Sequence, residues 1–324
     1  MPLTDEQFAD WVAGLGDQVE ARLRTAVETP DGFVREAARY LIDAGGKRLR
    51  PALTIAAGGY GLDRGLDVDA LMDAAVVVEL THVASLYHDD VMDEADLRRG
   101  RPTAHRQWGN SVAIMVGDFL LAQASLLGAR LGEAFMAYQA GTLARLVQGQ
   151  IAELRGPGEG TDPIAHHLAV ISGKTAALFG AAARYGGMFA GLPEEPVEAL
   201  TQYGEHLGMA FQLADDLLDI LSDESGKRPG TDLREGVPTL TTLLVRRANR
   251  PEDAHLVAAL AAPVSEADLP HVLAELRAHP AVDEARTQVR RWADQANDCL
   301  LGFPDSAVTR ALRTLCDQAV VRTR

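Results

Sequence analysis

The sequence is poor in cysteine, in aromatic residues and in basic charge. Its two cysteines, Cys299 and Cys316, lack the spacing of a metal site, which argues against a zinc ribbon or a disulfide-stapled secreted fold and for a reducing compartment. Aromatic residues make up 5% of a chain that is 47% hydrophobic, a balance that favours closely packed helices over sandwiched sheets. A net charge of -15 disfavours binding to a nucleic-acid backbone.

Two further segments are absent from the sequence. The start of the chain, residues 1–6, has no basic stretch followed by an apolar one, so we expect no secretory signal. No run of 18 uninterrupted apolar residues occurs, so we expect no transmembrane helix. Together with the cysteine usage, these absences predict a cytoplasmic protein.

Helix breakers are missing from residues 66–99, which contain neither glycine nor proline. This stretch predicts one long helix, and its apolar middle at 74–80 suits a helix inside a bundle. No useful alternating strand pattern or interdomain linker is evident. We therefore predict an all-α protein with a single domain over residues 1–324. Other helices are expected at 4–26, 31–43, 104–130, 132–154, 162–190 and 195–222, with shorter ones between 238 and 322.

The pattern Asp-Asp-x-x-Asp occurs twice. The first copy is Asp89, Asp90 and Asp93, and the second is Asp215, Asp216 and Asp219. On a helix, residues i and i+4 lie on one face about 6 Å apart. The first and last carboxylates of each copy should therefore point the same way.

Stacked like charges in apolar helices require neutralisation. Carboxylate clusters suit Mg²⁺, which keeps some waters and takes other ligands from substrate phosphates. A plain alternative is a solvated helix face, but two copies with identical spacing disfavour it. The repeated motif predicts a magnesium-dependent clamp for a diphosphate.

Basic residues beside glycines offer phosphate ligands. The segment 45–51 puts Lys47, Arg48 and Arg50 next to two glycines, which permit close backbone approach. Arg98 and Arg99 follow the first aspartate motif, about two and a half turns beyond Asp89. The alternatives are a charged loop and cations that complement a helix dipole. Their place directly after the acidic motif favours phosphate binding.

Three further residues are candidate ligands. Lys174 stands in a Ser-Gly-Lys-Thr sequence that lacks the earlier glycine of a nucleotide-binding loop, so we reject that loop. Lys227 lies in the loop after the second aspartate motif. His82 is seven residues before Asp89 and shares nearly the same helix face, although a lone histidine in an apolar helix is often only a core residue.

Taken together, these motifs resemble those of the trans-type polyprenyl diphosphate synthases, of the farnesyl, geranylgeranyl and longer-chain kind, and we expect a long-chain member. The resemblance runs nearly end to end. It implies an all-α bundle around a deep central cavity, usually in a homodimer, that joins isopentenyl diphosphate to an allylic diphosphate with Mg²⁺. The stretches that carry it are 45–51, 88–100, 149–150, 174–175, 211–219, 226–227 and 230–235.

The resemblance also implies a role for each matching residue. Asp89, Asp90, Asp93, Asp215, Asp216 and Asp219 would bind Mg²⁺. Arg98, Lys174 and Lys227 would hold the allylic diphosphate. Lys47, Arg50, His82 and Arg99 would hold isopentenyl diphosphate. Thr175 and Gln212 would line the reacting carbons.

Product length can be argued from the helix that carries the first motif. Ser85 and Ala84 lie four and five residues before Asp89, one turn, or about 5.4 Å, deeper. Both are small, so a growing chain should pass them. In terms of the family that the chain resembles, an open level one helix turn below Asp89 implies a long product, beyond geranylgeranyl and of roughly six to ten isoprene units.

Four alternatives stay open. A farnesyl or geranylgeranyl diphosphate synthase would make a shorter product with the same motifs. A class I terpene cyclase shares the first aspartate motif, but its family pattern has other ligands in the second. A histidine–aspartate phosphohydrolase, prompted by His88 and Asp89, would need more histidines than the pair His166 and His167. A non-catalytic partner subunit should have lost aspartates that this chain retains.

Overall fold

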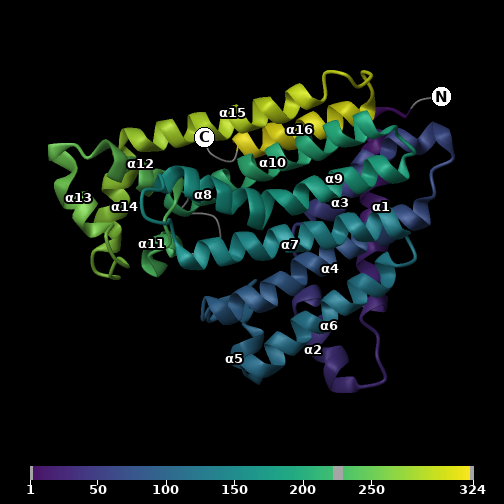
Figure 1. The fold of residues 1–324 in the computed structure, drawn as a ribbon, viewed down its shortest axis with the longest axis horizontal. Coiled ribbons are helices and arrows are strands. Elements are labelled where there is room, and N and C mark those ends of the chain that lie inside the picture. Colours follow the sequence, from purple (N-terminus) through teal and green to yellow (C-terminus); the bar gives the residue numbers. More distant parts are fainter. Residues whose placement is uncertain (1–2, 222–228, 322–324) are drawn as a thin grey trace. The chain divides into compact units, whose positions relative to one another are not determined.

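A computed structural model describes residues 3–221 and 229–321. Within these ranges the chain is helical apart from its loops and one two-stranded hairpin (Figure 1). The predicted all-α class is therefore confirmed.

The chain divides into two compact units. Unit 1 comprises Met1–Ala144, Ala181–Thr201 and Phe303–Leu312, and unit 2 comprises Arg145–Gly180, Gln202–Gly302 and Arg313–Arg324. Most of the boundaries between them fall inside helices, and the boundary at Gly302 and Phe303 lies in a loop. The single domain over 1–324 stays a prediction.

Each unit has helices of its own. Unit 1 holds α1 (Asp5–Ala26), α2 (Gly32–Asp43), α3 (Leu49–Gly58), η1 (Gly59–Arg64), α4 (Val68–Met92), β1 (Leu97–Arg98), β2 (Arg101–Pro102), α5 (Ala104–Trp108) and α6 (Asn110–Gly128). Unit 2 holds α8 (Pro163–Ile171), η2 (Ser172–Ala176), α11 (Thr231–Glu235), α12 (Leu240–Ala248), η3 (Pro251–Asp253), α13 (Ala254–Ala259), α14 (Leu269–Ala278) and α15 (Pro280–Cys299). The helices that contribute to both units are α7 (Glu133–Arg155), α9 (Ala177–Phe189), α10 (Glu194–Leu221) and α16 (Ala307–Val321).

Helix α4 is the core of unit 1. Its start is capped by Asp67, whose carboxylate accepts from the Ala70 N–H at 3.0 Å, and it packs along α6 (Figure 1). Both helices are long and apolar enough to cross a membrane by length and composition alone. Because 72% of the apolar window of α4 is buried, α4 is a core helix, and α6 is its packing partner.

The predicted helix over 66–99 is too long at its end. The helix stops at Met92, and β1 and β2 form an antiparallel hairpin directly afterwards. Glu94 (φ 49°), Arg99 (φ 52°) and Gly100 (φ 74°) adopt left-handed backbone conformations that end the helix and turn the hairpin. Acidic side chains at a helix C-terminus oppose the helix dipole. They are a sequence signal that the helix ends near the aspartate motif, and the prediction missed it because it relied on the absence of glycine and proline.

The other predicted helices have smaller corrections. The stretch 104–130 breaks at Gly109 (φ 87°) into α5 and α6. The stretch 162–190 is helical, but its middle, η2, is a π-helix. Helix α3 was not predicted. It begins after Arg48, which takes a left-handed conformation (φ 47°) that sequence patterns rarely reveal in a non-glycine residue.

Candidate active site

The first aspartate motif ends α4 in unit 1. Asp89 is half-buried and Asp93, which caps the helix end, is exposed. Asp89 and Asp93 are one turn apart, and the Asp93 N–H donates to the Asp89 carbonyl at 2.8 Å. The two carboxylates thus have the shared face that their spacing predicts, on a part of α4 that solvent reaches.

Asp90 differs from its neighbours because it is fully enclosed. Its Oδ1 accepts a hydrogen bond from Arg98 Nε at 2.7 Å and forms an ion pair with Arg98 Nη2 at 2.7 Å, while Oδ2 has no hydrogen-bond partner among the described residues. Burial raises the pKa of Asp90, although the Arg98 charge opposes the shift. Arg98 lies on β1 rather than on a frayed helix end, so the hairpin returns this guanidinium to the motif.

A basic cluster lies on unit 1 around Arg50, His82 and Arg99. Burial lowers the pKa of Arg50 to about 10; the Glu79 carboxylate opposes this shift and the Arg99 charge adds to it. Burial and the charges of Arg50 and Arg99 hold the pKa of His82 well below its usual range. His82 is therefore neutral at pH 7. Crowded cations of this kind favour an anionic ligand.

Two glycine-loop details shape this cluster. A Cβ on Gly46 would lie 2.9 Å from Nη2 of Arg99, and the φ of 154° at Gly46 is one that residues with a side chain rarely adopt, so glycine suits this position. Lys47 follows it and is exposed. Arg48 instead anchors the loop, because it donates to Glu20, to Glu79 Oε1 at 2.7 Å and to the Ile42 carbonyl at 2.7 Å. The structure thus separates an anchoring arginine from the residues predicted to bind substrate.

The second aspartate motif lies on the part of α10 in unit 2. Thr175 Oγ1 donates to Gln212 Oε1 at 3.1 Å, and Gln212 Nε2 donates to Asp216 Oδ1 at 3.0 Å. Asp215 is half-buried. Three residues that the sequence singled out separately therefore form one hydrogen-bonded chain.

Asp219 organises the loop that follows. Its two carboxylate oxygens accept from the N–H groups of Thr231 and Asp232 at 3.1 and 3.0 Å. These bonds bring Asp232 beside the motif, where burial and then the charges of Asp216 and Asp219 raise its pKa to about 8. The charges of Asp215, Asp216 and Asp219 all act on Asp232, and a divalent cation held by carboxylate oxygens would relieve this repulsion.

Lys174 lies in the π-helix η2, a feature that often re-aims functional side chains. A Cβ on Gly149 would lie 2.6 Å from the Lys174 backbone nitrogen, so the glycine of α7 lets η2 pack against it. The Lys174 Nζ is 2.5 Å from Glu153 Oε2. The sequence indicated Lys174 but not the π-turn that positions it.

Sequence reasoning gave no role to three residues here. Asp232 was part of a motif but had no assigned function. Gln150 is 6% exposed, and both of its amide atoms lack a hydrogen-bond partner among the described residues. His167 Nε2 is 3.5 Å from Asp216 Oδ2. A buried amide without a partner, such as that of Gln150, is expected to bind a ligand or water. Burial is visible only in the folded structure, so the sequence could not reveal this residue.

The remaining predicted residues are placed as follows. Ala84 has no exposed surface, whereas Ser85 is half-buried and donates its hydroxyl to the His82 carbonyl at 2.8 Å. Of the two small residues, Ser85 is on the accessible strip of α4 with His82 and Asp89. Lys227 lies outside the described residues.

Comparisons with known proteins agree with these features. Residues 31–276 match the family model described as polyprenyl synthetase. A nonaprenyl diphosphate synthase from Mycobacterium tuberculosis is 45% identical over 99% of this chain and 96% of that protein. An octaprenyl diphosphate synthase from Escherichia coli is 33% identical over 99% of this chain and 98% of that protein.

A solved structure is similar over nearly the whole chain. A geranylgeranyl pyrophosphate synthase from Corynebacterium glutamicum, in complex with calcium and isoprenyl diphosphate, is 41% identical and superposes with a TM-score of 0.87, covering 97% of each chain. The fold is therefore that of the isoprenyl synthases, and these enzymes use a divalent metal.

Proposed function

Since this chain belongs to the polyprenyl synthetase family and is thus a trans-prenyltransferase, we propose that it makes a long polyprenyl diphosphate from isopentenyl diphosphate and an allylic primer. The expected product has about six to ten isoprene units, because Ala84 and Ser85, one helix turn below Asp89, are small and long-chain members of the family make products of this size. The relative named for a nonaprenyl product, at 45% identity, is the observation that carries this length.

In the reaction, the allylic carbon–oxygen bond breaks and the isopentenyl double bond attacks the carbon that has lost its diphosphate. A proton then leaves, so the products are the elongated diphosphate, inorganic diphosphate and a proton. Arg98 and Lys174, with Lys227, would hold the allylic diphosphate, and Thr175 and Gln212 would line the reacting carbons. The enzyme needs no nucleophile of its own, because binding and charge stabilisation lower the barrier.

The second substrate, isopentenyl diphosphate, would bind to the basic cluster of unit 1. Arg50 and Arg99 there keep their charge close together, which a diphosphate would stabilise. Neutral His82 would donate a hydrogen bond without adding repulsion. Exposed Lys47 would complete the set. The pKa of Arg50 is lowered to about 10 because burial disfavours its charge, and a bound anion would stabilise that charge.

The divalent metal of this family is expected to be Mg²⁺ here, because the ligands offered are carboxylate oxygens. When bound, it would neutralise the departing diphosphate. Asp89 and Asp93 would be accessible ligands in the first motif, and in the second the half-buried Asp215 and the buried Asp216 would be the corresponding ligands. Asp90 and Asp219 belong to the predicted set as well, and both also hold neighbouring groups in place.

We further infer a homodimer. On α6 of unit 1, Ile114, Met115 and Leu126 are 42%, 64% and 63% exposed, and apolar side chains in such number on one helix mark an interaction surface. A second copy of this chain would cover them. Sedimentation of the purified protein would give the dimer mass, and Met115→Glu should shift it to the monomer.

This soluble enzyme is expected in the cytoplasm.

The product assay tests the proposal directly. Purified protein is incubated with Mg²⁺, labelled isopentenyl diphosphate and farnesyl diphosphate, and chain lengths are resolved. Products of about six to ten units are expected. Products of roughly four units or fewer would show a farnesyl or geranylgeranyl synthase instead, with a chain stopped near the level of Ala84 and Ser85. No elongation from any primer would favour a terpene cyclase or a non-catalytic partner subunit.

A further inference from the structure

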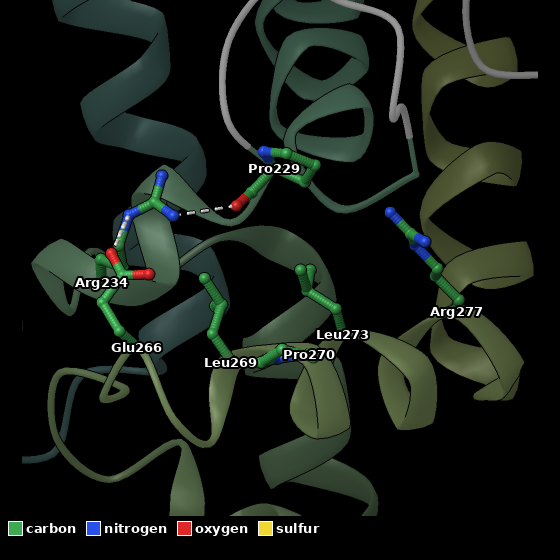
Figure 2. A pocket seen from close by; sticks show the side chains of 7 residues that line it. All are labelled: Pro229, Arg234, Glu266, Leu269, Pro270, Leu273 and Arg277. Carbon is green, nitrogen blue, oxygen red and sulfur yellow. Dashed lines mark hydrogen bonds and ion pairs between the residues drawn. The ribbon is translucent and has the colours of Figure 1, made fainter.

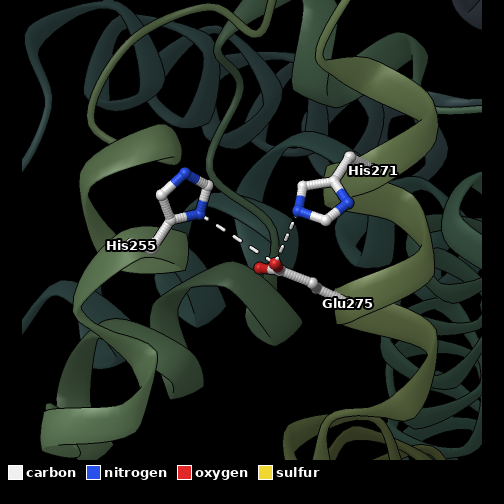
Figure 3. A group of neighbouring side chains, drawn as sticks. All are labelled: His255, His271 and Glu275. Atoms are coloured by element: carbon white, nitrogen blue, oxygen red, sulfur yellow. Dashed lines mark ion pairs between the residues drawn. The ribbon is translucent and has the colours of Figure 1, made fainter.

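A group of metal-ligating side chains lies on unit 2, away from the aspartate motifs in the sequence. It consists of His255 on α13 and of His271 and Glu275 on α14 (Figure 3). The ligand atoms of the three residues all lie within 4.8 Å of one another. Nothing in the prenyl-transfer chemistry uses this group.

We propose that His255, His271 and Glu275 form a binding site for a transition-metal ion, with Zn²⁺ as the preferred ion. Two imidazole nitrogens and one carboxylate oxygen are a zinc-type ligand set, whereas Mg²⁺ prefers oxygen alone. Water would fill the fourth position, as it does where a protein offers three ligands.

The geometry suits convergence on one ion. His271 Nε2 is 3.0 Å from Glu275 Oε1, and His255 Nδ1 is 3.9 Å from the same oxygen. Tetrahedral ligands about 2.0–2.1 Å from zinc are about 3.4 Å apart, so small side-chain rotations are sufficient. Figure 3 shows both rings directed at the carboxylate from two different helices.

The backbone around the group is held by the core. His271 and Glu275 are one turn apart on one face of α14, while Leu269, Val272, Leu273 and Leu276 on the other face are buried. Leu256 anchors α13 next to His255, which is 75% exposed at its side chain. The two helices therefore present preformed positions, and the exposed rings are accessible to an ion from solvent.

A bound ion would brace the segment that supports the loop of Asp232. Leu269 and Leu273 of α14, with Pro229 and with Arg234 of α11, line a cavity of about 450 Å³ (Figure 2). The Val264 N–H, between α13 and α14, donates to the Leu233 carbonyl of α11 at 2.9 Å. Fixing α13 to α14 would thus stiffen the support of this loop.

Zinc titration of the full-length protein by calorimetry, in excess Mg²⁺ to occupy the carboxylate motifs, tests the site. We expect one ion per chain at micromolar concentration. Losing a group that only hydrogen-bonds a metal ligand weakens metal binding by about tenfold or more. His255→Ala and His271→Ala each remove a ligand itself, so each should weaken zinc binding by at least about tenfold. Glu252→Gln, which removes an exposed carboxylate near α13, should bind as the wild type does.

A second measurement separates this site from other zinc ligands. Co²⁺ in place of zinc should give the visible absorption of a four-coordinate ion, and both histidine variants should lose it. Zinc should also raise the melting temperature of the wild type but not of these variants. Unchanged zinc affinity in both variants, or no binding below millimolar zinc, would overturn the proposal. Circular dichroism checks that each variant is folded.

Discussion

Arg98 directs two nitrogen donors at one carboxylate oxygen of Asp90, each at 2.7 Å. One residue was predicted to hold diphosphate and the other to bind metal, yet in the fold they are partners. This pairing makes Asp90 a positioning residue for Arg98 in addition to a candidate ligand. It also explains how a buried carboxylate is tolerated, since a charge-assisted pair offsets part of its desolvation.

The first prediction separates Asp90 from Asp89. Asp89→Asn should lower turnover by roughly 10³-fold and raise the Mg²⁺ concentration needed for half-maximal rate, because an accessible charged ligand is lost. Asp90→Asn should chiefly raise KM for the allylic diphosphate, because Arg98 loses its partner. Steady-state kinetics at several Mg²⁺ concentrations distinguishes the two effects. Identical Mg²⁺ dependence in both variants would contradict the division.

The second prediction concerns Asp232, whose pKa is raised to about 8. A carboxyl group with a raised folded pKa destabilises the protein increasingly as pH rises from about 4 to the folded value, and fully above it. Asp232→Asn should therefore raise the melting temperature of metal-free protein at pH about 8 and change it least near pH 4.

Magnesium provides the control for this experiment. Because the cation would neutralise the carboxylates around Asp232, adding Mg²⁺ should stabilise the wild type more than Asp232→Asn. The difference in melting temperature between the two proteins should then shrink. A variant that is less stable than the wild type at every pH, with or without metal, would show that Asp232 is not held under charge repulsion.

The third prediction uses two glycines of α7. Gly149→Ala places a Cβ 2.6 Å from the Lys174 backbone nitrogen, so the π-helix must shift. We expect a loss of about 1–3 kcal/mol in the free energy of unfolding and a fall in kcat/KM on the order of 10²-fold, since Lys174 and Thr175 move with it.

Gly141→Ala is the matched control on the same helix. A Cβ at Gly141 meets no atom within 4 Å, so alanine should increase the free energy of unfolding by about 0.5–1 kcal/mol through its better helix propensity. Activity should be unchanged. Equal effects of the two substitutions would show that the approach of α7 to the π-helix does not position Lys174.

The fourth prediction concerns product length. Ser85 is on the accessible strip of α4 and Ala84 is enclosed. Ser85→Phe should shorten the product at little cost in stability. Ala84→Tyr should also shorten it, but by overpacking a closed position, at about 1–3 kcal/mol of stability. Chain lengths and melting temperatures of both variants check this. Unchanged length in both would place the limit elsewhere.

Much of the site could be predicted because it depends on local spacing. The i, i+4 relation of Asp89 and Asp93 follows from helix geometry alone, as does the position of Ser85 one turn before them. The second motif repeated the same logic at Asp215 and Asp219. The all-α class was predictable for a similar reason, since composition and breaker spacing act along the chain.

Other features could not be predicted because they depend on contacts between distant segments. The hairpin that returns Arg98 to Asp90 required a left-handed turn at Arg99, which non-glycine residues rarely adopt. Asp232 reaches the second motif only because Asp219 accepts two of its loop's backbone N–H groups. The anchoring role of Arg48 likewise depends on Glu20 and Glu79, far away in sequence.

The sequence by itself determined the chemistry of this protein: repeated carboxylates, basic glycine loops and a helical chain long enough to carry them. These are properties of residue type and of the 3.6-residue helix period. The tertiary structure alone decided which charges are buried, which arginine anchors and which one is crowded, and that two histidines meet a glutamate between α13 and α14. Burial and pairing depend on which distant segments pack together, and no local pattern encodes that.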